Sequence, residues 1–330
     1  MAMRYSNFVE AAAQAPVILA DGGLETRLIY QDHLKLPDFA SFLPLFDPCG
    51  HSAIEALYRS YFDIAADTGL PMQVGTPTWR AHPDGLARQG FTAPGDLHRV
   101  NAAAVALLQN LREARGLKGQ VFIAGVIGPR RDGYDPHNAP GAGEARAYHS
   151  AQTACLAGLG VDLLYAPTFA SADELRGVAA AMAASGLPYA LAPVIDAGGA
   201  LRDGTPLTDA IGRIDAEVTP RPLHYLIGCV HPTTFRKARQ HHPQLSDRVA
   251  ARVVGLKANA SNLPPDQLDK LSHLEEGQPE NFAGLMLGLH RDYGLRVLGG
   301  CCGTDDRHIR AIANRLLAFI SKGHDRLPSE

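Results

Sequence analysis

The chain has 330 residues, of which 46% are hydrophobic and 20% charged, and its formal net charge is −3. This length and composition suit one α/β barrel domain spanning residues 1–330, with a large apolar core. No polybasic run and no apolar stretch of the ~20 residues needed to cross a membrane occurs, so nucleic acid and membranes are not expected partners. The N-terminal residues lack the pattern of a signal peptide and predict a short helix, so we expect a cytoplasmic protein.

Eight short apolar or β-branched segments, each ended by turn residues, are typical of strands. Helical patterns separate most of them, over residues 52–70, 96–116, 143–160 and 171–187, and Ser171 and Thr304 are expected to cap two helices. Strand and helix alternating eight times predict parallel strands closed into a (β/α)8 TIM barrel. No G-x-G-x-x-G motif follows the first strand, which disfavours a dinucleotide-binding sheet. The predicted strands are residues 16–21, 71–76, 120–128, 161–167, 188–196, 224–230, 252–259 and 296–301.

The chemistry of such a barrel takes place at the carboxyl ends of its strands, and three of the five cysteines are found there. Cys229 ends the sixth strand, whereas Cys301 and Cys302 end the eighth. An odd number of cysteines in a chain of this size argues against a disulfide framework. Only the seventh strand separates the sixth strand from the eighth, so the three thiolates could converge on one point. Three converging thiolates are the geometry of a zinc site that has three protein ligands and one open coordination position.

The adjacent pair of cysteines requires an irregular backbone. Neighbouring residues of a strand point to opposite faces, so Cys301 and Cys302 can meet one ion only where the strand ends. Gly299, Gly300 and Gly303 permit a turn and a close approach at this place. Adjacent cysteines are poor disulfide partners. The alternative is an inert, buried pair of small side chains, but the glycines and the third cysteine favour a metal site.

Several segments resemble the homocysteine S-methyltransferase family, whose members include betaine-dependent and S-methylmethionine-dependent enzymes. They are ADGGLETRL near the start, GVIGPRRDGY after the third strand, IGCVHP, GLKANAS and GGCCGTDDRHI at the last three strands. The resemblance implies a zinc ion held by Cys229, Cys301 and Cys302, with a thiol in the fourth position. It further implies methyl transfer to that thiol from an onium donor such as S-methylmethionine or betaine, with homocysteine, giving methionine, as the favoured acceptor.

The resemblance also implies a substrate pocket around the metal. Asp21 would bind polar or charged ends of the substrate, or else would be a turn acid. Trp79, the only tryptophan, would face the onium methyl groups by cation–π attraction or pack at the rim. Asn259 would order the loop after the seventh strand or serve as an ordinary turn residue. The expected substrate-binding residues are Asp21, Gly22, Gly23, Thr76, Trp79 and Asn259.

Two positions depart from the family pattern. Many homocysteine enzymes carry a glutamate at the end of the fourth strand that binds the substrate amino group, but this chain has Pro167 there, and Gly228 stands where an asparagine is common. Without that glutamate an ammonium loses a charge-assisted contact, typically worth ~1.5–3 kcal/mol. Either Asp21 alone holds the amino group, or the enzyme uses a different thiol or onium compound.

Three other classes of function remain open. A zinc hydrolase is disfavoured because three thiolates make the metal a weak Lewis acid. A thiol redox protein would use Cys301 and Cys302, and a binding module would have no transfer activity. His231 is either a substitute metal ligand, a residue that contacts a metal ligand, or an ordinary loop histidine. The expected partners are a small thiol and an onium donor, and if the chain forms a homo-oligomer, a dimer is favoured over an arm-swapped tetramer.

Overall fold

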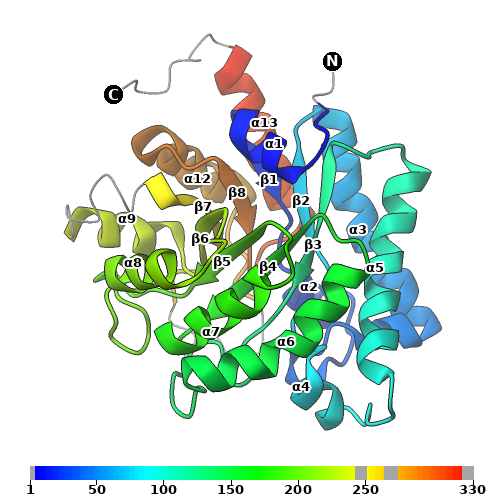
Figure 1. The fold of residues 1–330 in the computed structure, drawn as a ribbon. Coiled ribbons are helices and arrows are strands. Elements are labelled where there is room, and N and C mark those ends of the chain that lie inside the picture. Colours follow the sequence, from blue (N-terminus) through cyan, green and yellow to red (C-terminus); the bar gives the residue numbers. More distant parts are fainter. Residues whose placement is uncertain (1–3, 242–250, 264–273, 322–330) are drawn as a thin grey trace.

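The structure, a computed structural model, describes residues 4–241, 251–263 and 274–321. Eight parallel strands form one closed barrel in the order of the sequence, from β1 to β8 (Figure 1). The predicted (β/α)8 barrel is therefore confirmed, and each of the eight predicted strands occurs. The strands are β1 (Ile18–Ala20), β2 (Met72–Gly75), β3 (Val121–Val126), β4 (Leu163–Phe169), β5 (Tyr189–Pro193), β6 (His224–Gly228), β7 (Val253–Ala258) and β8 (Val297–Gly300).

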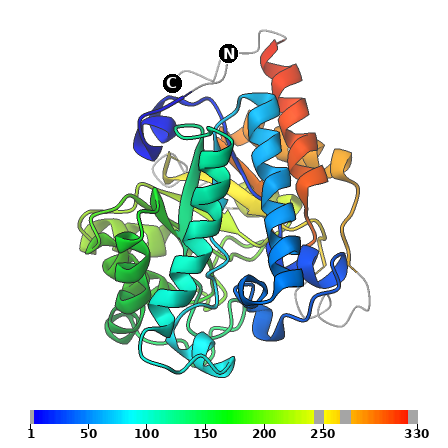
Figure 2. The same cartoon turned by 90° about the vertical axis from the view of Figure 1, so that its right-hand side faces the viewer.

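Helices cover the outside of the barrel. Figure 2 turns α3, α5 and α13 towards the viewer, where they run along one flank in blue, cyan-green and red. The predicted cap of α7 is confirmed, because the Ser171 side chain accepts a hydrogen bond from Glu174 N. Among the described residues, no helix has both the length and the apolar character needed to cross a bilayer. The α-helices are α1 (Phe8–Gln14), α2 (Leu24–Tyr30), α3 (Pro48–Thr68), α4 (Pro83–Arg88), α5 (Asp96–Ala114), α6 (Ala142–Gly158), α7 (Ala172–Ala183), α8 (Leu207–Glu217), α9 (Pro232–His241), α12 (Pro279–Tyr293) and α13 (Asp306–Ser321).

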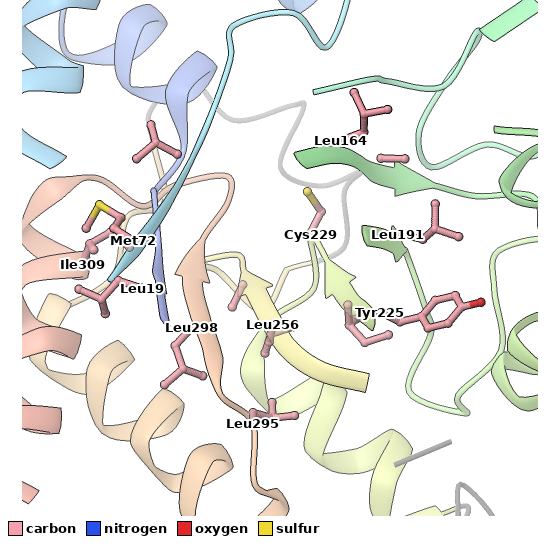
Figure 3. Close-up of a cluster of buried hydrophobic side chains, with 14 of the residues drawn as sticks. Leu19, Met72, Leu164, Leu191, Tyr225, Cys229, Leu256, Leu295, Leu298 and Ile309 are labelled. Atoms are coloured by element: carbon pink, nitrogen blue, oxygen red, sulfur yellow. The ribbon is translucent and has the colours of Figure 1, made fainter. Parts of the chain in front are cut away.

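Alternate residues of the strands divide the core into two layers. Phe122 and Leu163 belong to the cluster that fills the barrel, whereas Ile123 and Leu164 belong to the cluster between the strands and the helices. This division follows from the period of two along a strand. Figure 3 shows part of the outer cluster, with Cys229 beyond the end of β6 and directed away from the labelled leucines of β7 and β8.

The amino-terminal end of the barrel is closed by α1. The buried ring of Phe8 meets Phe122 of β3 and His224 of β6 edge to face, with ring centroids 5.5 and 6.0 Å apart. Both partners stand at or near the start of their strands, so α1 covers the end of the barrel opposite to the cysteines. The other end, where the strands finish, is the one at which barrels of this class place their functional residues.

The start of α13 differs from the prediction. Asp305 is the capping residue, since its carboxylate accepts a hydrogen bond from Arg307 N at 3.0 Å, and an anion is favoured at this end of the helix dipole. Thr304 Oγ1 instead donates to the Cys301 carbonyl at 2.7 Å. The prediction that Thr304 caps the helix is therefore wrong, and Thr304 belongs to the loop that carries the cysteines.

Candidate metal centre

The side chains of Cys229, Cys301 and Cys302 meet where β6 and β8 end. Their Sγ atoms lie within 4.8 Å of one another; Cys229 is 5% exposed and the other two are partly buried. Tetrahedral zinc with Zn–S bonds of about 2.3 Å holds its sulfur ligands about 3.8 Å apart. Small movements of these side chains would reach that spacing, so the cluster is consistent with a metal site.

Cys229 and Cys301 are joined by a disulfide in the structure. This pairing differs from the redox alternative drawn from the sequence, which combined Cys301 with Cys302, and it agrees with the strain that a bridge between adjacent cysteines would cause. Two bonded sulfurs cannot act as two thiolate ligands, so only the reduced chain could hold a metal ion with all three cysteines.

The backbone at the end of β6 turns Cys229 towards the other cysteines. Cys229 has a φ of +52°, a left-handed conformation that is uncommon for residues other than glycine. Its amide donates to the Lys257 carbonyl of β7 at 3.0 Å, and its own carbonyl accepts a hydrogen bond from Asn259 Nδ2 at 2.9 Å. Asn259 thus fixes the peptide that carries Cys229. Its Oδ1 is a buried acceptor that has no partner among the described residues.

The glycines around the adjacent cysteines have two different structural roles. Only Gly303 has a positive φ, of +79°, and so provides the turn. Gly299 and Gly300 allow close packing: a β-carbon on Gly299 would lie 2.6 Å from Ala20 Cβ, and one on Gly300 would lie 2.7 Å from Thr304 Cβ and overlap its hydroxyl. Backbone contact with β1 and with the Thr304 side chain therefore requires these two glycines.

Gly22 and Gly23 lie beside the same loop. Gly23 N donates to Thr304 Oγ1 at 3.0 Å, and a β-carbon on Gly23 would overlap the Cys301 carbonyl. A β-carbon on Gly22 would lie 2.6 Å from Tyr61 Oη. The two glycines thus lie near the loop that carries the cysteines, and the contacts that require them are made with the protein itself.

Asp21 lies at the end of β1 and is 6% exposed. One carboxylate oxygen forms an ion pair with Lys257 Nζ of β7, and the other accepts a hydrogen bond from Gly75 N at 2.8 Å. Lys257 Nζ also lies 5.9 Å from the ring centroid of Tyr165, a residue of the inner cluster, so this ion pair is inside the barrel mouth. Sequence reasoning missed Lys257, although a lysine within a predicted buried strand was a usable signal.

A second acid, Glu25, stands in the first turn of α2 near this ion pair. Ser41 Oγ donates to its Oε1 at 2.8 Å. Burial raises the pKa of the Glu25 carboxyl above its ordinary value, and the positive charge of Lys257 partly opposes this shift. Lys257 is therefore the cation that interacts with both acids at this side of the mouth.

Thr76 and Trp79 follow β2. Thr76 Oγ1 accepts a hydrogen bond from Val126 N at 3.0 Å, which ties β2 to β3. Trp79 Nε1 donates to the Pro167 carbonyl at 3.4 Å, and the Arg80 guanidinium carbon lies 4.0 Å from the centroid of the indole. One face of the only tryptophan thus already carries a cation, which the protein itself supplies.

Thr168 is a contact of the cysteines that sequence reasoning missed. Its Oγ1 lies 3.1 Å from Cys229 Sγ, and its φ is +65°. The pairing of β4 with β5 shifts between Pro167 and Phe169, which places Thr168 at an irregularity of the strand. Pro167 within the predicted strand was the only hint of this irregularity. His231, by contrast, is engaged at the start of α9, where its Nδ1 lies 2.7 Å from Thr233 Oγ1.

Residues 18–316 match the family model described as homocysteine S-methyltransferase. The chain belongs to the homocysteine S-methyltransferase family. Its fold is similar to that of the homocysteine methyltransferase MmuM from Escherichia coli. The metallated form of MmuM has a TM-score of 0.71 at 20% identity, covering 92% of this chain and 98% of that chain, and the oxidised form has 0.73 at 22% identity, covering 92% and 97%. The apo form has 0.64 at 19% identity.

Family membership confirms the resemblance drawn from the strand-end motifs. The matched range begins in β1 and ends in α13, so it includes every strand of the barrel and all three clustered cysteines. The three-cysteine cluster therefore lies within the part of the chain that matches the homocysteine S-methyltransferase family.

Proposed function

We propose that the chain is a zinc-dependent S-methyltransferase that moves a methyl group from an onium donor, such as S-methylmethionine or betaine, to a small thiol. The supporting observation is the convergence of Cys229, Cys301 and Cys302 at the barrel mouth of a homocysteine S-methyltransferase family member. Three thiolates form a soft ligand set that suits zinc and leaves one of four positions open. Homocysteine, giving methionine, is the acceptor that the family name implies.

When bound, zinc would supply the positive charge that converts a thiol with an ordinary pKa of about 8.5 into a thiolate at neutral pH. The chain's own residues would orient the ligands. Asn259 holds the Cys229 carbonyl, and Thr304 holds the Cys301 carbonyl. Thr168 Oγ1 is close enough to donate a hydrogen bond to a Cys229 thiolate, which would stabilise the charge on that sulfur.

The methyl transfer itself requires little acid–base catalysis by protein side chains. The acceptor sulfur forms a bond to the methyl carbon while the bond from that carbon to the onium centre breaks. The bonding pair leaves with the sulfur or nitrogen of the donor, which departs as a neutral thioether or amine. The remaining task is to align the two substrates and exclude water, which is consistent with a site whose side chains mostly fix backbone and loops.

The test uses the reduced protein, purified without chelators and assayed for zinc by elemental analysis. Incubation with homocysteine or other small thiols and with betaine, S-methylmethionine or dimethylsulfoniopropionate should give an S-methyl product detectable by mass spectrometry. Cys302→Ala should lose zinc and activity, whereas Cys49→Ala, which alters an exposed cysteine of α3, should keep both. A reduced protein that holds no zinc and methylates no thiol would refute the proposal, and cycling of the Cys229–Cys301 bond with dithiols would then favour a redox function.

A further inference from the structure

Asp21 and Lys257, which form an ion pair, are joined by backbone hydrogen bonds to the segments that carry the cysteines. The Asp21 carbonyl accepts a hydrogen bond from Gly300 N at 2.9 Å, and the Lys257 carbonyl accepts one from Cys229 N at 3.0 Å. The pair therefore joins β1 to β7 across β8, and each of its members is bonded through the backbone to a segment that carries a clustered cysteine. A thiol that reached the sulfur cluster would therefore lie at the same end of the barrel as this ion pair.

A thiol with an α-ammonium group needs an anionic partner in such a buried place. The charge of Asp21 is already paired, because one carboxylate oxygen forms the ion pair with Lys257 Nζ and the other accepts the hydrogen bond from Gly75 N. The last residues of β4, Pro167, Thr168 and Phe169, include no acid. Glu25 interacts with the same Lys257 charge, and Ser41 already donates to it. The Lys257 ammonium thus interacts with the same carboxylates, Asp21 and Glu25, that a substrate ammonium would need.

A neutral acceptor does not replace these carboxylates. Asn259 Oδ1 is buried and without a partner among the residues that the structure describes, and it belongs to the side chain that holds the Cys229 carbonyl. A hydrogen bond between an ammonium and an amide oxygen leaves the charge uncompensated, whereas one to a carboxylate neutralises it. A substrate ammonium that used Asp21 would therefore have to displace Lys257.

We propose that Lys257 is a specificity-determining residue, and that its ammonium group makes the site select an acceptor thiol whose carbon chain carries no ammonium group. This inference rests on the proposed S-methyl transfer and narrows its acceptor. Lys257 occupies Asp21 in the free protein, so a thiol without an amino group binds the cluster with the ion pair intact. Homocysteine, in contrast, would bring a second ammonium to a carboxylate that is already neutralised.

The test compares L-homocysteine with 4-mercaptobutanoate, which has the same carbon chain, thiol and carboxylate but no amino group. Binding to the reduced, zinc-loaded protein is measured by isothermal titration calorimetry, and kcat/KM is measured for both thiols with the same onium donor. The wild-type protein should prefer 4-mercaptobutanoate in both measurements. Lys257→Met should free Asp21 and shift the ratio of the two values towards homocysteine by about 10- to 100-fold.

Lys118→Met is the matched control, because Lys118 is exposed in the turn before β3, at the opposite end of the barrel, and its substitution should leave the ratio unchanged. A wild-type preference for homocysteine would overturn the inference while leaving S-methyl transfer in place, and that comparison needs no variant to fold. An unchanged ratio in folded Lys257→Met would equally remove Lys257 from specificity. If neither thiol binds or is methylated, the proposed function fails and the inference fails with it.

Discussion

Replacing Lys257 by methionine should destabilise the fold far more than replacing an exposed lysine. The side chains of Asp21 and Lys257 are only 8% and 13% exposed, so loss of the ammonium leaves a buried carboxylate whose remaining partner is Gly75 N. Removing one member of a buried ion pair typically costs about 3–5 kcal/mol. Asp21→Asn should cost a similar amount, since it keeps an acceptor for Gly75 N but leaves the Lys257 ammonium without its counter-charge.

The double variant, Asp21→Asn with Lys257→Met, distinguishes the interaction energy between the two charges from the contribution of each residue alone. It contains neither buried charge, so its free energy of unfolding should equal or exceed that of either single variant. Urea titrations followed by circular dichroism on the reduced protein provide the four values of the cycle. The exposed pair Glu55–Arg59 on α3, with side chains 28% and 53% exposed, is the control, and its coupling should be only ~0.3–0.5 kcal/mol.

Additive losses of unfolding free energy in the two single variants would show that Asp21 and Lys257 do not stabilise each other. A double variant that is less stable than the wild-type protein by the full sum of the two single effects would mean that the two charges are solvated separately. A solvated Asp21 would be available to a substrate ammonium, and Lys257 would then not select the acceptor thiol.

Three further substitutions test other parts of the site and the fold. Gly300→Ala should lower the free energy of unfolding by about 1–3 kcal/mol and weaken zinc retention, because its methyl group overlaps Thr304; an unchanged urea midpoint would contradict this. Thr168→Val should weaken zinc binding about 10-fold or more in competition with a chromophoric chelator, because the hydroxyl beside Cys229 Sγ is lost, and equal affinities would exclude that role. Burial lowers the pKa of His224 from 6.5 to about 3, so the unfolded chain binds one more proton than the folded chain between these values, and stability falls as the pH drops from 6.5 towards 3. His224→Phe should remove up to ~1.4 kcal/mol per pH unit of this loss, as measured by urea titrations at pH 6.5, 5.5 and 4.5.

The barrel and its cysteines could be predicted because their signals are local and repeated. Short apolar segments ended by turn residues marked all eight strands, and the strand ends then placed Cys229 beside Cys301 and Cys302 by topology alone. No side-chain geometry was needed for that step, since parallel strands of a closed barrel finish at one end. The family motifs lie at these same strand ends, so both lines of reasoning led to the same residues.

The partners of individual side chains could not be predicted in the same way. The ion pair of Asp21 with Lys257 depends on the register that brings β1, β7 and β8 together, and register is set by the closed barrel, not by either segment. The left-handed φ angles of Thr168 and Cys229 oppose the local preferences of both residues, so only the surrounding structure can impose them. Thr304 and Asp305 are both good capping residues, and the competing bond to Cys301 decided between them.

The first strand meets the last one beside the cysteine cluster. Gly23 and Thr304, hydrogen-bonded to each other, are 281 positions apart in sequence, and Ile18 pairs with Val297 a few residues earlier on each side. An ion held by Cys301 and Cys302 would fix the loop after β8 that is hydrogen-bonded to Gly23, and so would reinforce one side of the junction at which the circle of strands is completed. Removal of the ion should therefore favour local opening of the junction between β1 and β8. When a chelator is added, the amide hydrogens of these two strands should be the first to exchange faster.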